Sequence, residues 1–464
     1  MVIHLIGICG TAMATLAALL RHRGFTVRGS DEHVCPPMSD FLTAEDIQTF
    51  EGYSADHIDA SVDLVVIGNA ISRGNPELEA VLDRKVRHVS LPEAIREHFL
   101  WDARSVVIAG THGKTTTTSI TGWLLTHGGV DPTVFIGGIA RNFGPNGSSY
   151  RIGRRDAPFV IEGDEYDSAF FDKTAKFLKY LPDIAVINNV EFDHADIYDD
   201  LDAVLIAFRR LVNLVPRRGL LLLGADSAHA AALAPLAKSR VRTFGTAEGV
   251  DWRAGEIASE SSRSTFRVWE RGVDRGVFRV SLVGAHNVRN ALAAIAVGSE
   301  CGVEMETLRT GLMQFAGVKR RLELVGTKRD IAVYDDFAHH PTAVAETLAA
   351  VRAAEPQRRI WAVFEPRSAS SCRRVFQDDF AQAFRSADEV VVASVYRSTL
   401  PESERLSEAQ LVDDLRQAGV SARHLPDVDT IVRQVSTEAR DGDLIVIMSN
   451  GAFGGIHRRL LEAL

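Results

Sequence analysis

The chain has 464 residues, which is more than one ordinary hydrophobic core accommodates and predicts about three domains. Its composition, 46% hydrophobic and 24% charged, is typical of a soluble globular protein, and no segment approaches the roughly 20 continuous apolar residues of a membrane span. The 52 basic and 61 acidic side chains give a net charge of −9, which argues against nonspecific binding to nucleic acid or to a membrane surface.

The four cysteines are scattered along the chain and form neither a CxxC pair nor a dense disulfide framework. Reduced thiols are therefore expected. The amino-terminal "MVIHLIGICGTAM" begins directly with a strand and a glycine turn, without a basic leader or a cleavage site. We expect a cytoplasmic enzyme that has neither a nucleic-acid partner nor a membrane partner.

The first predicted elements form a strand, a glycine turn, a helix and a second strand. Ile3, Leu5 and Ile6 predict a strand, Gly7 and Gly10 follow it, and a helical pattern then runs to Gly24. The second strand, "FTVRGSD", ends at Asp31. This βαβ pattern predicts a nucleotide site at the glycine turn.

A further strand, "VDLVVIGNAI", brings Asn69 and Ser72 to a carboxyl end, where α/β folds form ligand sites. The same ingredients occur in NAD-binding proteins, but the G-x-G-x-x-G pattern fails here. Cys9 and Ala12 stand where its second and third glycines should be. A nucleotide other than a dinucleotide is therefore favoured.

The segment "SVVIAGTHGKTTTTSITGWLL" predicts a phosphate-binding loop between a buried strand and a helix that ends at Gly128. Backbone N–H groups and the positive helix end suit phosphate, Lys114 adds a cation and Thr115 a hydroxyl for Mg²⁺. Only two residues separate Gly110 from Gly113, so the loop is a shortened variant of the usual pattern. The alternative is a threonine-rich tight turn.

Two strand-like runs, "FVIEGDEYDSAFF" and "DIAVINNVEFDHADIYDD", follow this loop. Glu162 and His194 lie at their ends, where they would share a crevice with the phosphate loop and supply metal ligands. In the alternative interpretations, Glu162 belongs to a solvated acidic turn with Asp164 and Glu165, and His194 only makes a hydrogen bond within a loop.

The segment "GAHNVRNALAAIAV" predicts an apolar helix with polar residues at its start. Asn287 could approach an adenine there, or it could cap the helix. A basic stretch, "AGVKRRLELVG", leads into a third α/β region whose helix begins at Pro341. The run from Lys319 to Arg321, taken by itself, is typical of a solvated charged surface.

Taken together, these segments resemble the Mur ligase family, the ATP-dependent amide-forming enzymes of peptidoglycan synthesis. The motifs that carry the resemblance are "GTHGKTTT", "EGDEYD", "NNVEFDHADIY", "GAHNVRNALAA", "GVKRRLELVG" and "YDDFAHHP". The resemblance implies an α/β fold with a Rossmann-like UDP-sugar domain over 1–102, a central ATP-binding P-loop domain over 103–320, and a Rossmann-like acceptor domain over 321–464. It also implies Mg²⁺ as the metal.

The resemblance further implies a role for individual residues. The expected UDP-sugar site contains Gly7, Cys9, Gly10, Thr11, Asp31, Asn69 and Ser72. The expected ATP site contains Gly110, Thr111, His112, Gly113, Lys114, Thr115, Thr116, Asn287, Arg321, Asp336 and His340. Thr115, Glu162 and His194 are the expected metal ligands, and Lys114, Glu162 and His194 are the residues expected to support catalysis.

Other segments, including "VCPPMSDFL" and "LPEAIREHFLW", resemble the murein peptide branch of the family. That branch joins the tripeptide L-alanyl-γ-D-glutamyl-meso-diaminopimelate to UDP-N-acetylmuramate during cell-wall recycling. The expected partners are thus ATP, UDP-N-acetylmuramate and a peptide acceptor, bound by a monomer or a weak homodimer. The alternatives are the branch that adds L-alanine and, in another class, a nucleotide sensor without turnover.

The third region offers an acceptor site. Arg367 and Ser368, in "FEPRSASSCRR", follow a buried strand, and a planar guanidinium suits a carboxylate of the peptide. The glycine-rich "SNGAFGG" follows the last strand and would let an extended peptide approach the backbone. The alternative is an ordinary surface salt bridge at Arg367.

Overall fold

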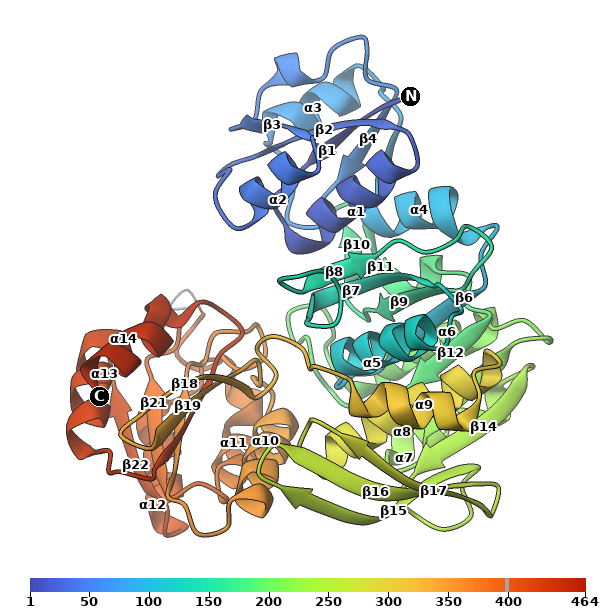
Figure 1. Ribbon diagram of the computed structural model, residues 1–464. Helices are drawn as coiled ribbons and strands as arrows, with labels where there is room; N and C mark the ends of the chain where they lie inside the picture. Colours follow the sequence, from blue (N-terminus) through green and yellow to red (C-terminus); the bar gives the residue numbers. More distant parts are fainter. Residues whose placement is uncertain (397–399) are drawn as a thin grey trace. The chain divides into compact units, whose positions relative to one another are not determined.

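The computed structural model describes residues 1–396 and 400–464 (Figure 1). It contains two compact units, and each combines segments that are distant in sequence. The first comprises Met1–Glu191, Asp202–Arg253 and Leu292–Gly311, and the second comprises Phe192–Leu201, Ala254–Ala291 and Leu312–Leu464. The three domain ranges expected from the sequence stay a prediction.

The amino-terminal part of the first unit is a five-stranded parallel sheet, drawn in blue in Figure 1. The strand order is β3-β2-β1-β4-β5. The strands are β1 (Val2–Ile6), β2 (Thr26–Asp31), β3 (Gln48–Glu51), β4 (Leu64–Ile67) and β5 (His88–Ser90). The helices are α1 (Thr11–His22), α2 (Met38–Ala44), α3 (Pro76–Asp83) and α4 (Leu91–Ile95).

This strand order explains where a ligand can bind. Strand β1 pairs in parallel with β2 on one side and with β4 on the other, so the order reverses between β1 and β4. Ligands of open α/β sheets bind outside the carboxyl ends of the strands at such a switch point. The glycine turn after β1 and the segment after β4 both lie there, as the sequence predicts.

The central part of the first unit contains the strand order β8-β7-β9-β6-β12-β13-β14. The strands are β6 (Ser105–Ala109), β7 (Thr133–Ala140), β8 (Ser148–Arg151), β9 (Phe159–Gly163), β12 (Ile184–Ile187), β13 (Leu220–Gly224) and β14 (Arg240–Gly245), and a separate hairpin joins β10 (Asp167–Ala169) to β11 (Asp172–Ala175). The helices here are α5 (Lys114–His127), α6 (Leu201–Leu214) and α7 (Ala228–Ala231). Because β6 pairs in parallel with β9 and β12, all three carboxyl ends lie at one edge of the sheet.

The second unit contains an antiparallel group, β16 (Arg263–Glu270) and β17 (Val273–Val280), and a six-stranded sheet. The order of that sheet is β18-β19-β23-β20-β21-β22. Its strands are β18 (Glu323–Lys328), β19 (Ile331–Asp336), β20 (Ile360–Phe364), β21 (Glu389–Ala393), β22 (Ser421–Leu425) and β23 (Leu444–Met448). Its helices are α10 (Pro341–Ala354), α11 (Gln377–Ala383), α12 (Glu408–Gln417), α13 (Val428–Glu438) and α14 (Ile456–Ala463).

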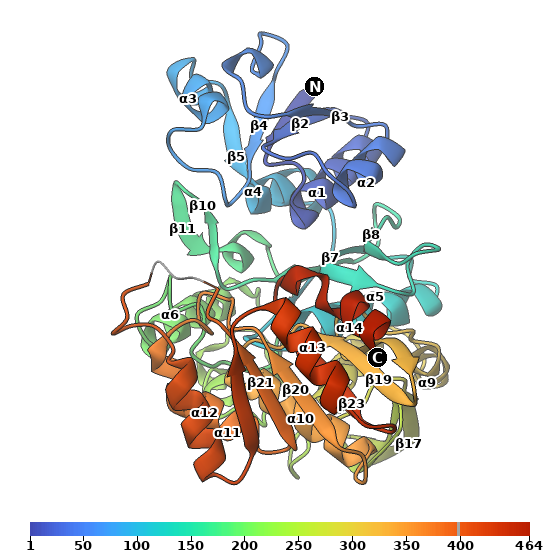
Figure 2. The same ribbon diagram turned by 90° about the vertical axis from the view of Figure 1, so that its left-hand side faces the viewer.

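Helices cover both faces of the six-stranded sheet, as Figure 2 shows. Alternate residues of β20 belong to different cores, because successive side chains of a strand point to opposite faces. Ile360, Ala362 and Phe364 pack with residues of α10, α11 and α12. Trp361 and Val363 pack with residues of α13 and α14. A sheet buried on both faces matches the continuous apolar strands of the sequence and confirms the expected Rossmann-like class.

Four elements contain a boundary between the units. They are α6, whose first residue Leu201 belongs to the second unit, β15 (Trp252–Glu260), α8 (Ala285–Glu300) and α9 (Met305–Met313). Helix α8, with 16 residues, is the longest of the described helices. None of the helices formed by residues 1–396 and 400–464 combines the length and the apolar character needed to cross a membrane.

Candidate active site

The predicted phosphate loop connects β6 to α5. Its two glycines are required by the backbone: Gly113 adopts a φ of 81° at the start of α5, and a Cβ at Gly110 would approach the backbone nitrogen of Asn188 to 3.0 Å. Thr115 and Thr116 lie buried in the first turn of the helix. The strand, the turn and the helix that the sequence predicts are thus confirmed, and the helix ends at Gly128 as expected.

Residues 188–191, which follow β12, hold this loop in place. Thr111 donates from its backbone nitrogen to the carbonyl of Asn189, and the amide oxygen of Asn189 accepts from the nitrogen of His112 at 2.8 Å. The hydroxyl of Thr111 accepts from the nitrogen of Glu191 at 2.9 Å. These bonds fix the loop backbone to the neighbouring strand end.

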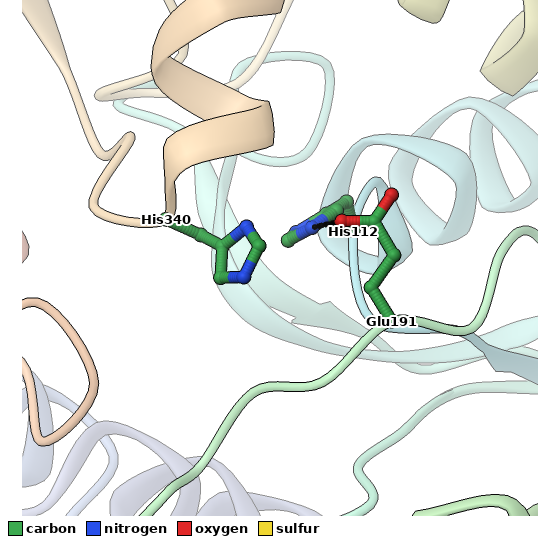
Figure 3. A group of neighbouring side chains, drawn as sticks. All are labelled: His112, Glu191 and His340. Atoms are coloured by element: carbon green, nitrogen blue, oxygen red, sulfur yellow. Dashed lines mark hydrogen bonds and ion pairs between the residues drawn. The ribbon is translucent and has the colours of Figure 1, made fainter. Parts of the chain in front are cut away.

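The imidazole of His112 also faces the carboxylate of Glu191. Its Nε2 lies 3.2 Å from Oε2 of Glu191, and Figure 3 shows the two side chains from the first unit next to each other. Figure 3 also draws His340, which belongs to the second unit. The contact with Glu191 orients the ring of His112, which lies between the two glycines of the loop.

Lys114 is held by oxygen atoms on two sides. Its ammonium donates to the carbonyls of Gly110 at 2.8 Å and Thr111 at 3.2 Å. It also donates to both carboxylate oxygens of Glu165, at 2.8 and 3.1 Å. Burial lowers the pKa of Lys114, but the nearby Glu165 and Asp164 carboxylates outweigh this effect, so its pKa is raised and it carries its charge.

Glu162 lies at the end of β9 beside the first turn of α5. Its Oε1 accepts from the hydroxyl of Thr115, and its Oε2 accepts from the nitrogen of Gly137, both at 2.7 Å. Burial, assisted by the charge of Asp164, raises the pKa of Glu162 above its ordinary value. Glu162 and Glu165 are buried, so the interpretation as a solvated acidic turn is wrong for these two residues.

The chemistry of Thr115 and Glu162 fits a magnesium ion. Both side chains offer the hard oxygen ligands that Mg²⁺ prefers, and they lie at a helix start that also suits phosphate. Burial disfavours the charged form of a carboxylate, and a divalent cation beside it stabilises that charged form. These two side chains therefore offer oxygen ligands that suit Mg²⁺.

His194, the third expected metal ligand, lies in the second unit. It has a φ of 53°, and its backbone carbonyl accepts from the nitrogens of Ile197 and Tyr198. The neighbouring Asp193 is buried and accepts from the hydroxyl of Ser370. Because His194 and Glu162 belong to different units, their joint role at a metal stays a prediction.

The second unit also contains the expected ATP residues Arg321 and Asp336. Asp336 is buried at the end of β19 and accepts from the nitrogens of Leu322 at 2.6 Å and Ala338 at 2.8 Å. Burial raises the pKa of Asp336, although the nearby Arg321 guanidinium opposes this rise. Arg321 itself lies 5.0 Å from the ring centroid of Phe337. Arg321 is thus near Asp336 rather than part of a fully solvated basic surface.

His340 and Asn287 both have local structural partners. His340 caps α10: its Nδ1 accepts from the nitrogen of Thr342, while its Nε2 donates to the carbonyl of Phe192 at 3.0 Å. Asn287 lies inside α8 and donates from its side chain to the carbonyl of Val283. The interpretation of Asn287 as a helix cap is therefore wrong, since α8 already begins at Ala285. Contact of either residue with a nucleotide stays a prediction.

The expected UDP-sugar residues gather at the switch point of the amino-terminal sheet. Gly7 has a φ of 83°, and Gly10 precedes Thr11 at the start of α1. The backbone nitrogen of Cys9 donates to Oδ2 of Asp31 at 2.8 Å, so this acid orders the glycine turn itself. Burial raises the pKa of the Cys9 thiol to about 11, with further contributions from Asp31 and Cys35.

Asn69 and Ser72 follow β4 and are exposed to solvent. The amide of Asn69 donates to Oδ1 of Asp167, the first residue of β10, at 3.3 Å. Phe170 of the same hairpin packs against the core of the amino-terminal sheet. The β10–β11 hairpin therefore borders the expected sugar site, which the sequence alone did not reveal.

The expected acceptor residues, Arg367 and Ser368, follow the carboxyl end of β20. The guanidinium of Arg367 stacks on the ring of Tyr396, 3.7 Å from its centroid, and lies 3.7 Å from the carboxylate of Glu365. A Cβ at Gly451 would collide with this guanidinium, so the glycine-rich segment after β23 adjoins Arg367. The hydroxyl of Ser368 donates to the hydroxyl of Ser371 at 2.8 Å.

Sequence reasoning missed three side chains near these sites: Glu165, Glu365 and Tyr396. Glu165 was visible in the acidic motif, but its position in the sequence does not reveal that it pairs with Lys114. Glu365 directly follows a buried strand, which is the same signal that pointed to Arg367. Tyr396 follows β21 in the next position of the sheet, and an exposed aromatic at a strand end was its available signal.

Sequence models of one family match three consecutive parts of the chain. The "Mur ligase family, catalytic domain" matches residues 2–100, the "Mur ligase middle domain" matches residues 108–298, and the "Mur ligase, glutamate ligase domain" matches residues 320–451.

Individual relatives match over the whole length. The UDP-N-acetylmuramate--L-alanyl-gamma-D-glutamyl-meso-2,6-diaminoheptandioate ligase of Escherichia coli strain K12 is 41% identical, with 100% of this chain and 98% of the relative covered. The UDP-N-acetylmuramate--L-alanine ligase of Solibacter usitatus is 36% identical, with coverages of 100% and 95%.

Solved structures agree with these sequence relationships. A murein peptide ligase from Psychrobacter arcticus 273-4 superposes with a TM-score of 0.74 at 38% identity, covering 100% of this chain and 98% of the other. A UDP-N-acetylmuramate-alanine ligase from Thermotoga maritima superposes with a TM-score of 0.80 at 25% identity, covering 99% and 98%. The chain therefore belongs to the Mur ligase family.

Proposed function

We propose that this protein is an ATP-dependent ligase that joins L-alanyl-γ-D-glutamyl-meso-diaminopimelate to UDP-N-acetylmuramate through an amide bond, a reaction of peptidoglycan recycling. The observation that carries this proposal is the 41% identity, over the whole chain, to the Escherichia coli ligase named for these substrates. A second relative with the same name, from Haemophilus influenzae, is 39% identical over the whole chain.

The second candidate function is the addition of L-alanine to the same sugar nucleotide. One relative of that name is 36% identical, and one such structure has the higher TM-score, 0.80. A TM-score compares backbone paths, which both kinds of ligase share, whereas selection of an acceptor depends on side chains. Sequence identity is therefore the better guide, and it favours the tripeptide.

The proposed reaction has two steps. The lactyl carboxylate of UDP-N-acetylmuramate attacks the γ-phosphorus of ATP, which forms an acyl phosphate and releases ADP. The amine of the acceptor then attacks the acyl carbon, and inorganic phosphate leaves. Lys114 would neutralise charge on the transferred phosphoryl group, and the backbone N–H groups of the glycine loop would bind the phosphates of ATP.

The side chains of Thr115, Glu162 and His194 would hold Mg²⁺. When bound, this ion would neutralise the phosphate oxygens and favour attack by the carboxylate. Gly110, Thr111, His112, Gly113 and Thr116 would line the triphosphate, while Asn287, Arg321, Asp336 and His340 would complete the ATP site. These assignments are proposals that rest on the family resemblance and on the oxygen chemistry of Thr115 and Glu162.

The remaining sites follow the same logic. We propose that the glycine turn from Gly7 to Thr11, together with Asp31, Asn69 and Ser72, binds the UDP part of the sugar nucleotide. Arg367 would pair with a carboxylate of the tripeptide, and Ser368 would support the segment that carries it. The domain ranges 1–102, 103–320 and 321–464 are proposed as the sugar-nucleotide, ATP and acceptor domains. Because ATP and a UDP-linked sugar are the substrates, we place the reaction in the cytoplasm.

An acceptor comparison with purified protein tests this function. ATP, Mg²⁺ and UDP-N-acetylmuramate are held fixed, tripeptide or free L-alanine is added, and the ligated product and ADP are measured by mass spectrometry and a coupled assay. We expect higher kcat/KM with the tripeptide. Higher kcat/KM with L-alanine would support the second candidate, and ATP binding without ADP release, even with the sugar nucleotide and either acceptor present, would indicate a nucleotide sensor without turnover.

A further inference from the structure

Lys114 has a buried carboxylate partner that is not one of the proposed metal ligands. Both oxygens of Glu165 lie within 3.1 Å of its ammonium, and the exposed fraction of the Glu165 side chain is only 2%. The exposed fraction of the Lys114 side chain is 11%. Buried ion pairs of this kind hold their partners in one geometry more firmly than exposed pairs do.

The position of Glu165 is set by the central sheet. Strand β9 pairs in parallel with β6, with Glu162 opposite Ile108, so the turn after β9 lies next to the phosphate loop after β6. That turn is anchored on its other side, because Asp164 accepts at its carbonyl from the nitrogen of Phe177 and at its carboxylate from Lys176. Glu165 is therefore presented to Lys114 from a rigid segment.

The contacts of Lys114 also imply an exchange when ATP binds. An ammonium has three hydrogens, and those of Lys114 are shared among four oxygen atoms in the phosphate loop and Glu165. To reach phosphate oxygens while keeping Glu165, the ammonium must release the carbonyls of Gly110 and Thr111. The Glu165 carboxylate can remain in contact during this exchange, since it approaches from a different segment of the chain.

We propose that Glu165 is a positioning residue for phosphoryl transfer: it tethers the ammonium of Lys114 at the phosphate loop before and after the loop carbonyls are exchanged for phosphate oxygens. This inference rests on the proposed role of Lys114. The tether has two opposite consequences. The tether holds the ammonium where negative charge develops during phosphoryl transfer, which raises kcat. The negative charge of Glu165 also reduces the attraction between Lys114 and ATP in the ground state.

The test compares Glu165→Gln, Glu165→Asp, Lys114→Ala and the double variant Lys114→Ala/Glu165→Gln. We expect Glu165→Gln to lower kcat about tenfold or more while KM for ATP stays the same or falls. Glu165→Asp keeps the charge and should restore part of kcat. In the double variant, the Glu165→Gln change should have no further effect beyond that of Lys114→Ala, because residues that act as one unit are not additive.

Asp172→Asn is the matched control. Asp172, in the β10–β11 hairpin, pairs with Lys179 at 2.6 Å with a side-chain exposure of 14%, and no ion pair or hydrogen bond of the described residues joins it to the phosphate loop. This variant should keep the parental kcat. Equal kcat for Glu165→Gln and the parent protein would overturn the inference, as would a loss of activity in Glu165→Gln that adds fully to the Lys114→Ala loss.

Binding of a fluorescent ATP analogue separates this inference from the proposed function. If Glu165 only stabilises the fold, Glu165→Gln should bind the analogue more weakly and melt at a lower temperature. If the inference holds, this variant should bind it as tightly as the parent or more tightly, and Lys114→Ala should bind it more weakly. These binding results do not depend on which acceptor the enzyme uses, and near-normal turnover of Lys114→Ala would instead remove the proposed role of Lys114.

Discussion

The hydroxyl of Thr115 donates to Oε1 of Glu162 over 2.7 Å, which joins the first turn of α5 to the end of β9. If both side chains hold Mg²⁺, Glu162→Gln should raise the Mg²⁺ concentration for half-maximal turnover about tenfold or more, because an amide is a weaker ligand than a carboxylate. The measurement is the rate of product formation during a Mg²⁺ titration at fixed ATP.

Thr115 offers a matched pair of variants for the same site. Thr115→Ser retains the hydroxyl and should leave the titration near that of the parent protein, whereas Thr115→Ala should shift it in the direction of Glu162→Gln. Superimposable titrations for the parent, Thr115→Ala and Glu162→Gln would contradict the assignment of a metal site to these residues.

Arg367 is expected to contribute to tripeptide binding through its guanidinium. Arg367→Ala should lower kcat/KM for the tripeptide between about 10-fold and 100-fold, the range for a lost hydrogen bond to a charged group. Gly451→Ala should have a similar effect, because its Cβ would displace the guanidinium. Arg373→Ala is the control from the same segment, since Arg373 pairs with Glu404. Unchanged tripeptide kinetics in Arg367→Ala would remove this residue from the acceptor site.

Glu77 makes the amino-terminal sheet sensitive to acid. It is buried and accepts from Ser30 at Oε2 and from His57 at Oε1, and Nε2 of His4 lies 3.2 Å from Oε2. Burial raises the pKa of Glu77, but these hydrogen bonds outweigh burial and lower its pKa below the ordinary value of 4.5. A depressed pKa in the folded state stabilises the fold above pH 4.5, and this stability is lost as the pH falls through the folded pKa.

The urea midpoint of Glu77→Gln should therefore lie well below that of the parent protein at neutral pH, and the difference should shrink as the pH falls below about 4.5. A cost of about 1–3 kcal/mol at neutral pH is expected for the lost charged hydrogen bonds. Glu79→Gln, which weakens an exposed pair with Arg73 and an exposed hydrogen bond from the nitrogen of Gly74, should change the midpoint little. A difference between Glu77→Gln and the parent that does not change with pH would refute the assignment.

Cys9 should react slowly with iodoacetamide. Its pKa is raised to about 11 from an ordinary 9.0, so the fraction of thiolate near neutral pH is roughly 100-fold lower. A thiolate of higher pKa is also about tenfold more nucleophilic, which offsets part of this loss. Its alkylation should thus be about tenfold slower than that of an ordinary cysteine, as measured by peptide mass spectrometry. Asp31→Asn should accelerate the reaction of Cys9, and alkylation at the rate of exposed Cys35 would be inconsistent with the raised pKa.

Local patterns were sufficient to predict the elements around the phosphate loop. The apolar run from Val106 to Ile108 and the glycines at the helix end locate β6 and α5 to within about one residue. The same signals identified the strand ends that carry Glu162 and Arg367. These features are determined by residues that are close together in the sequence, so they can be predicted without knowledge of the tertiary structure.

The partner of Lys114 could not be predicted in this way. Glu165 is 51 positions away, and its proximity depends on the parallel register that places Glu162 opposite Ile108. An acidic turn that is solvated and one that binds a lysine have the same sequence pattern. Asn287 posed a similar problem, because an asparagine at a helix start and one inside the first turn differ only in where the helix begins.

The chain passes between the two compact units five times, which restricts where the gene can be divided into fragments. Neither unit is encoded by one continuous stretch. A fragment beginning at Leu312 would lack Phe192, whose ring stacks at 5.7 Å on Phe376 and whose carbonyl accepts from His340. Recombination between relatives should therefore succeed more often when residues 192–201 come from the same parent as the carboxy-terminal segment.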